Sequence, residues 1–141
     1  MSRQKIPQRL RDLVSDRAKY CCEYCYAQSK YSGPFSIEHI IPIAKGGNDE
    51  FDNLALACQH CNNYKYTKTH ALDPITQVSV PLYSPRQHKW TEHFAWNEDY
   101  SKIIGITSLG RATVLSLKLN RTESVNLRQV LFRLKVHPPH S

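Results

Sequence analysis

Two cysteine pairs constrain the fold of this 141-residue chain more than any other feature. They are Cys22-x-x-Cys25 and Cys58-x-x-Cys61, and 32 residues separate one pair from the other. A CxxC turn presents two sulfur atoms on one side, so two such turns can supply all four ligands of a tetrahedral Zn²⁺. Because a shell of four cysteines leaves no open coordination position, we expect the zinc to be structural. The intervening segment should therefore fold as a loop that the metal closes.

Other ligand assignments are compatible with the same segment. Cys21 is an alternative to Cys22 as the partner of Cys25, and the symmetric spacing of the two pairs favours Cys22. His60 lies inside the second pair, where it is either a ligand or an exposed side chain within reach of a phosphate; we favour the exposed position. A set of free thiols or a redox pair is the competing interpretation of the four cysteines.

Charge and cysteine usage limit the class of protein. The formal net charge is +7, which favours a polyanionic partner such as nucleic acid, although ordinary solubilising charge is an equally simple explanation. The first seven residues lack the apolar core of a signal peptide, and no stretch is long enough to span a bilayer. Five cysteines, four of them in CxxC spacing, are typical of metal binding in a reducing compartment. We expect a cytoplasmic protein without a membrane partner.

The apolar pattern of the first part predicts a helix, a strand and a second helix. Residues 7–19 carry apolar side chains at helical spacing, and residues 35–41 alternate and are rich in β-branched side chains. A further helix should begin near Asn53 or Cys58 and end at about residue 68. The strand therefore lies between the two cysteine pairs, and the second helix begins close to the second pair.

A break at residues 72–74 separates a second part. There we expect strands over residues 93–96 and 103–106, a helix from Thr107 or Ser108 to residue 119, and a last helix over residues 123–135. The predicted fold class is α+β. Residues 1–72 contain the N-terminal helix followed by the core. Residues 73–141 form a C-terminal extension that packs on this core and contains a small β-hairpin and two helices.

Polar residues suited to phosphodiester hydrolysis lie in and beside the enclosed segment: Glu38, His39, Asn53 and Asn62. This reaction requires a deprotonated water and stabilised charge on the phosphoryl oxygens. Mg²⁺ takes oxygen ligands from few protein groups, and Glu38 offers a carboxylate and Asn62 an amide oxygen. Because neighbouring side chains on a strand point to opposite faces, a bend is needed to bring Glu38 and His39 to one phosphate. Each residue alone is consistent with a structural role, but the combination favours a site.

Two motifs carry these residues: Glu38-His39-Ile-Ile-Pro-x-x-x-Gly-Gly, and then Asn53-Leu-x-Leu-x-Cys-x-x-Cys-Asn62-x-x-Lys65. Together they resemble the HNH endonuclease family, in the subgroup whose CxxC turns flank a ββα-metal core (His-Me finger). The resemblance covers about residues 20–70. It implies such a core, stapled here by a zinc site of four cysteines.

The resemblance also implies roles for the polar residues. His39 is the general base that takes a proton from water, and Asn53 fastens the loop and orients His39. Glu38 and Asn62 hold a catalytic Mg²⁺ or Mn²⁺. Two positions are notable: Glu38 stands where many members carry Asp or His and has a longer arm than Asp, and Asn62 replaces a histidine, which is a common variant. A neutral amide suits a hard cation better than a softer one.

The resemblance implies DNA as the substrate and no small-molecule cofactor. Lys65 and His60 are the expected nucleic-acid contacts, with a solvated helix lysine as the simpler interpretation of Lys65. The second part resembles an extension of some bacterial HNH proteins, to which the resemblance assigns no activity; its motifs are Pro81-Leu-Tyr-Ser-Pro-Arg86, Trp90-x-x-His93-Phe94 and Gly105-Ile-Thr-x-x-Gly-Arg111-Ala-Thr113.

We therefore expect a metal-dependent DNA endonuclease. The alternatives are a zinc-dependent nucleic-acid-binding module that does not cleave, and an interaction protein that uses the zinc turns as a scaffold.

Overall fold

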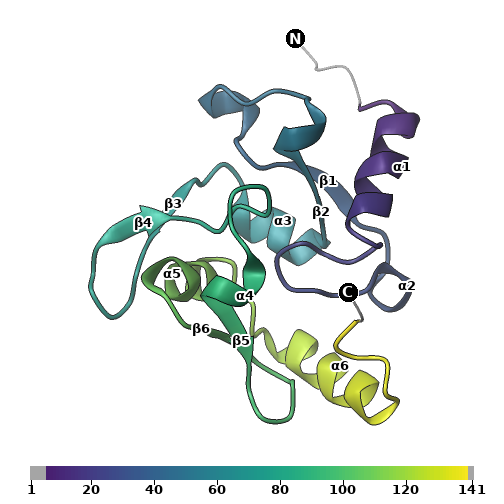
Figure 1. The fold of residues 1–141 in the computed structure, drawn as a ribbon, viewed down its shortest axis with the longest axis vertical. Coiled ribbons are helices and arrows are strands. Elements are labelled where there is room, and N and C mark those ends of the chain that lie inside the picture. Colours follow the sequence, from purple (N-terminus) through teal and green to yellow (C-terminus); the bar gives the residue numbers. More distant parts are fainter. Residues whose placement is uncertain (1–5, 140–141) are drawn as a thin grey trace.

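The computed structural model describes residues 6–139 and shows an α+β protein (Figure 1). The elements of the first half are α1 (Gln8–Arg17), α2 (Ser29–Ser32), β1 (Ser36–His39), the 3₁₀ turns η1 (Ile43–Lys45) and η2 (Phe51–Asn53), β2 (Leu54–Ala57) and α3 (Gln59–Lys65). The elements of the second half are β3 (His70–Leu72), β4 (Ser79–Pro81), α4 (Trp90–His93), β5 (Phe94–Trp96), β6 (Ile103–Gly105), α5 (Ser108–Ser116) and α6 (Thr122–Arg133).

The β1–β2 hairpin divides the first half into two packed sides. Its strands are antiparallel, with Glu38 opposite Ala55 and His39 opposite Leu54. Residues directly opposite each other share a face of the hairpin. Leu54 packs with Val14 of α1, whereas Ala55 belongs to the larger cluster that contains the zinc-site cysteines. Glu38 and His39 therefore point to opposite sides of the hairpin.

Helix α3 completes the expected ββα arrangement. The sequence pattern allowed a start at either Asn53 or Cys58, and in the structure the helix begins at Gln59 because residues 54–57 pair with β1 as strand β2. The sulfur of Cys58 caps the helix by accepting a hydrogen bond from the Cys61 amide at 3.4 Å. In Figure 1, α1 and α3 lie on either side of the hairpin. The second cysteine pair is thus built into the first turn of α3.

The extension contains the hairpin and the two helices that the sequence predicted. β5 pairs with β6, and α5 is capped by Thr107, whose hydroxyl accepts from the Gly110 amide at 3.0 Å. The hairpin β3–β4 was not predicted; it spans the expected boundary between residues 72 and 73.

One apolar cluster joins the two halves. It contains Tyr24 and Ala57 of the first half together with Trp90 and Leu119 of the second. The Trp90 indole also donates to the Tyr24 carbonyl at 3.1 Å. The division into two domains at residue 72 stays a prediction, since buried residues of both halves pack together. No helix within residues 6–139 has the length and apolarity that crossing a membrane requires.

Candidate functional site

The four cysteines of the two pairs converge on one point. The sulfurs of Cys22, Cys25, Cys58 and Cys61 all lie within 4.8 Å of one another, and all four side chains are buried. The Cys25 and Cys58 sulfurs are 3.7 Å apart. With Zn–S bonds of about 2.3 Å, the edge of a tetrahedron is about 3.8 Å. The cluster therefore fits a structural Zn²⁺.

The two other candidate ligands lie outside this cluster. Cys21 is buried but contacts the Lys19 carbonyl, and His60 is exposed. Within the cluster, burial raises the pKa of Cys22, while hydrogen bonding to Cys22 lowers the pKa of Cys25. Such shared protons are what a zinc ion replaces when it binds thiolates.

Glu38 points from the hairpin into the interior of the protein and is 4% exposed. Its Oε1 accepts a hydrogen bond from the Tyr24 hydroxyl, and its Oε2 lies 2.9 Å from the Lys65 ammonium. Lys65 also donates to the carbonyls of His39 at 3.2 Å and Ile40 at 2.9 Å. Burial raises the pKa of Glu38, and the charge of Lys65 opposes that effect. All three N–H bonds of Lys65 are used, and they clamp α3 to the end of β1.

This geometry contradicts the expected nucleic-acid contact of Lys65. Its side chain is 2% exposed, so its ammonium is a buried structural cation, neither a phosphate ligand nor a solvated helix lysine. Sequence spacing placed Lys65 one turn after Cys61 but gave no signal that the side chain turns inward to Glu38.

The catalytic cation expected between Glu38 and Asn62 does not fit this arrangement. Asn62 lies on α3, three residues before Lys65, and is half-buried. Both oxygens of Glu38 are already hydrogen-bonded, and one of them faces a positive charge. A divalent cation would have to approach within about 4 Å of that ammonium without a second carboxylate to balance the charge.

His39 points to the other side of the hairpin, where it meets Asp49. Its Nε2 lies 2.7 Å from Oδ1 of Asp49, and the two side chains are 22% and 43% exposed. A carboxylate only accepts hydrogen bonds, so in neutral His39 this contact places the proton on Nε2. Nδ1 then carries a lone pair that can take a proton. Sequence reasoning missed Asp49; the only signal was a carboxylate within two residues of the glycine pair of the loop.

Asn53 fastens the loop that carries Asp49. Its side chain accepts from the Ile41 amide at 2.8 Å and donates to the Ile41 carbonyl at 3.0 Å and the Asn48 carbonyl at 2.9 Å. Gly47 passes so close to the Ile41 carbonyl that an added Cβ would lie 1.7 Å from its oxygen. The loop therefore needs glycine at position 47. The close approach there lets Asp49, two residues later, reach His39.

A cleft of about 300 Å³ opens beside this loop, between the two halves of the protein. Ile41 and Asn53 of the loop line one wall, and Arg86 and His88 of the extension contribute to the other. The Arg86 guanidinium also forms an ion pair with Glu23, which ties this wall to the first half. The loop that follows His39 thus borders a cleft between the two halves.

Among the residues expected to form the site, the structure joins His39 and Asn53 through one loop and adds Asp49. It turns Glu38 away from them, toward Lys65. The chain matches the family described as HNH endonuclease over residues 22–68. No curated protein and no solved structure matches it. The matched segment contains both cysteine pairs and the whole His39 loop.

Proposed function

Because residues 22–68 match the family described as HNH endonuclease, we propose that this protein is a zinc-stapled endonuclease that hydrolyses DNA phosphodiester bonds. The contact between His39 and Asp49 carries the proposal. It leaves Nδ1 of His39 as a proton acceptor on a partly exposed face, beside a loop that Asn53 holds in place.

In this proposal His39 acts as the general base. Nδ1 takes a proton from a water molecule as the water oxygen attacks the phosphorus atom. Asp49 holds the imidazole ring through Nε2 and stabilises the positive charge that the ring gains. A positioned general base contributes about 10²–10⁴-fold to a reaction rate. Asp49 is therefore a positioning residue, because it acts through His39.

The backbone around His39 is held from two sides. Lys65 contacts the carbonyls of His39 and Ile40, and Asn53 contacts both polar groups of Ile41. A catalytic side chain gains from such fixation because a displacement of about 1 Å can reduce a rate about 100-fold. Lys65 and Asn53 serve the reaction as positioning residues.

Positive charge at the phosphoryl oxygens is a further requirement of this chemistry. The resemblance implies Mg²⁺ or Mn²⁺ for this purpose, while the described arrangement commits Glu38 to Lys65. The proposed roles of His39, Asp49, Lys65 and Asn53 do not depend on that ion. The nicking experiment therefore tests whether cleavage needs a divalent cation.

DNA is the proposed partner, in agreement with the net charge of +7. His60 is exposed on the first turn of α3, and we propose that it contacts a DNA phosphate. The variant His60→Ala should weaken retention of DNA at low salt without loss of zinc. Equal retention over a salt series would rule out this contact.

The experiment is nicking of supercoiled plasmid with Mg²⁺, with Mn²⁺ and with EDTA. The wild-type protein should nick, and His39→Ala should lose about 10²–10⁴-fold in rate while it keeps its zinc. Glu98→Ala is the control, because Glu98 is exposed between β5 and β6 and does not line the cleft beside the His39 loop. Nicking by His39→Ala at the wild-type rate would refute His39 as the base.

One observation favours a second candidate function, a nucleic-acid-binding module that does not cleave. The carboxylate that a catalytic cation would need is buried against Lys65. This candidate predicts salt-dependent retention of DNA with no nicking under any metal condition. That result, obtained with zinc-loaded protein, would replace the nuclease proposal.

A further inference from the structure

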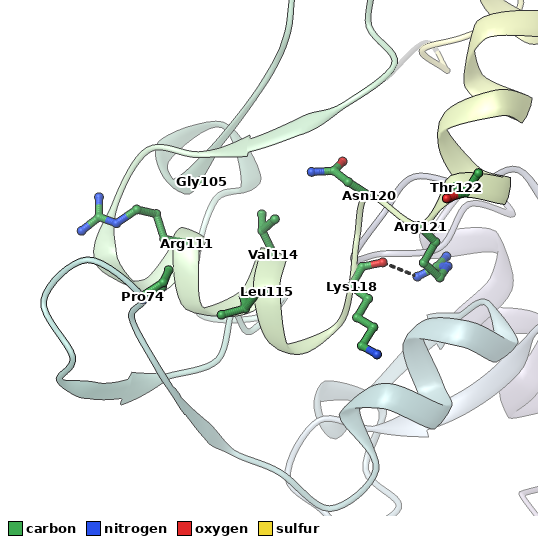
Figure 2. Close-up of a pocket in the computed structure, with 9 residues that line it drawn as sticks. All are labelled: Pro74, Gly105, Arg111, Val114, Leu115, Lys118, Asn120, Arg121 and Thr122. Carbon is green, nitrogen blue, oxygen red and sulfur yellow. Dashed lines mark hydrogen bonds between the residues drawn. The ribbon is translucent and has the colours of Figure 1, made fainter.

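Arg121 of the extension is a buried cation beside the zinc-site cysteines. It precedes α6 and is 9% exposed. Its Nη2 lies 3.8 Å from the Cys58 sulfur and its Nη1 lies 4.0 Å from the Cys61 sulfur. Nη1 also donates to the carbonyls of Leu117 at 3.3 Å and Lys118 at 3.0 Å. Figure 2 shows the bond to Lys118, at the junction between α5 and α6.

The charge of Arg121 has no carboxylate partner within residues 6–139. Its Nε atom is buried without a hydrogen-bond partner in that range. A guanidinium stays protonated in a protein, and burying it without a counter-charge is strongly unfavourable. Cysteines that keep most of their protons offer the guanidinium little counter-charge, whereas four thiolates around Zn²⁺ carry two net negative charges. The buried charge of Arg121 is therefore better balanced when the cysteines hold the metal.

Arg128, on α6, is a second buried arginine of the same region. It donates to the carbonyls of Ser101 at 3.0 Å and Leu119 at 2.7 Å, which carry no formal charge. Leu119 belongs to the same buried cluster as the zinc-site cysteines. Two buried cations of the extension thus contact the region around a cysteine cluster whose zinc-loaded form has two negative charges.

We propose that Arg121 is part of the zinc site, and that zinc binding and docking of the α5–α6 junction on the HNH domain are one coupled event. With zinc bound, the guanidinium donates to the sulfurs of Cys58 and Cys61 and shields them from solvent. Without zinc, the junction leaves the cysteines because the cation has lost its counter-charge. This inference is independent of cleavage, and it assigns the extension a role in holding the metal.

The first test is the rate of zinc release to a coloured chelator. Replacing groups that contact metal ligands typically reduces metal affinity about 10–100-fold, and we expect Arg121→Met to release zinc faster by that factor. Arg121→Lys should fall between Met and wild type, since it keeps the charge but loses the forked geometry. Arg133→Met, which removes an exposed cation of the same helix, is the control and should match wild type. Equal release by Arg121→Met and wild type would overturn the proposal.

The second test uses the wild-type protein, so it holds even if Arg121→Met fails to fold. Hydrogen–deuterium exchange is compared before and after zinc is removed by a chelator. Protection of α6 and of residues 117–121 should fall, while the β3–β4 hairpin, tied to α5 by the pair of Asp73 and Arg111, should keep its protection. Unchanged protection of α6, or an equal loss in both regions, would overturn the coupling.

Discussion

Glu38 and His39 are adjacent in the chain, yet the two faces of β1 give them opposite environments. Glu38 meets the ammonium of Lys65 in the interior, whereas His39 meets Asp49 at a partly exposed surface. Removing one partner of a buried ion pair is strongly destabilising, while an exposed pair contributes about 0–1 kcal/mol. Two adjacent residues of one strand thus serve different purposes, one structural and one chemical. Changes on the interior face should act first on stability, and changes on the open face should act on cleavage.

The largest effect should come from the zinc cluster, which anchors the interior face. Cys58→Ser removes one of four ligands, and structural zinc in small domains is worth about 10–16 kcal/mol of apparent binding free energy. We expect loss of zinc and of cooperative unfolding, measured by metal analysis and circular dichroism. Cys21→Ser is the control, because this buried thiol lies outside the cluster and should keep the metal. A folded, zinc-free Cys58→Ser protein would show that the cluster is not structural.

Lys65→Met should produce the next largest effect. It leaves the buried Glu38 without its counter-charge, and breaking such a pair costs about 3–5 kcal/mol. Urea unfolding measures the loss. The double variant Glu38→Gln with Lys65→Met should recover part of it, because no unpaired charge remains. A loss below about 0.5 kcal/mol for Lys65→Met would mean that the lysine is solvated after all.

Asp49→Asn should have a smaller effect, confined to the open face. The amide can still accept from His39 but carries no charge to stabilise the protonated ring. Nicking should slow by less than the about 10²–10⁴-fold expected for His39→Ala, and the free energy of unfolding should change by at most about 1 kcal/mol. Unchanged nicking would show that Asp49 does not assist His39.

Features that depend on local spacing were accessible from the sequence. The two CxxC turns identified the cluster, and Thr107 identified the start of α5. The strands predicted over residues 93–96 and 103–106 agree with β5 and β6 within one residue at each end. Each of these signals lies within a few residues of the feature that it predicts.

Features that depend on long-range pairing were not accessible. Lys65 is buried because Glu38, 27 residues earlier, faces α3, and no spacing rule reports that contact. Arg121 contacts the sulfur of Cys61, about 60 residues earlier in the chain, and local sequence gives no signal of this contact. Apolar character alone is also a poor guide to burial: Ile104 and Leu115 are exposed, because short elements leave one face to solvent.

The most direct test compares Glu38→Gln and His39→Ala in the same two assays, plasmid nicking and unfolding free energy. We expect His39→Ala to lose nicking and to keep its free energy of unfolding within about 1 kcal/mol of the wild-type value. Glu38→Gln should instead lose about 3–5 kcal/mol of stability, because it leaves Lys65 buried without a counter-charge. His39→Ala that nicks at the wild-type rate, or Glu38→Gln that loses nicking at full stability, would contradict the separation of the two faces.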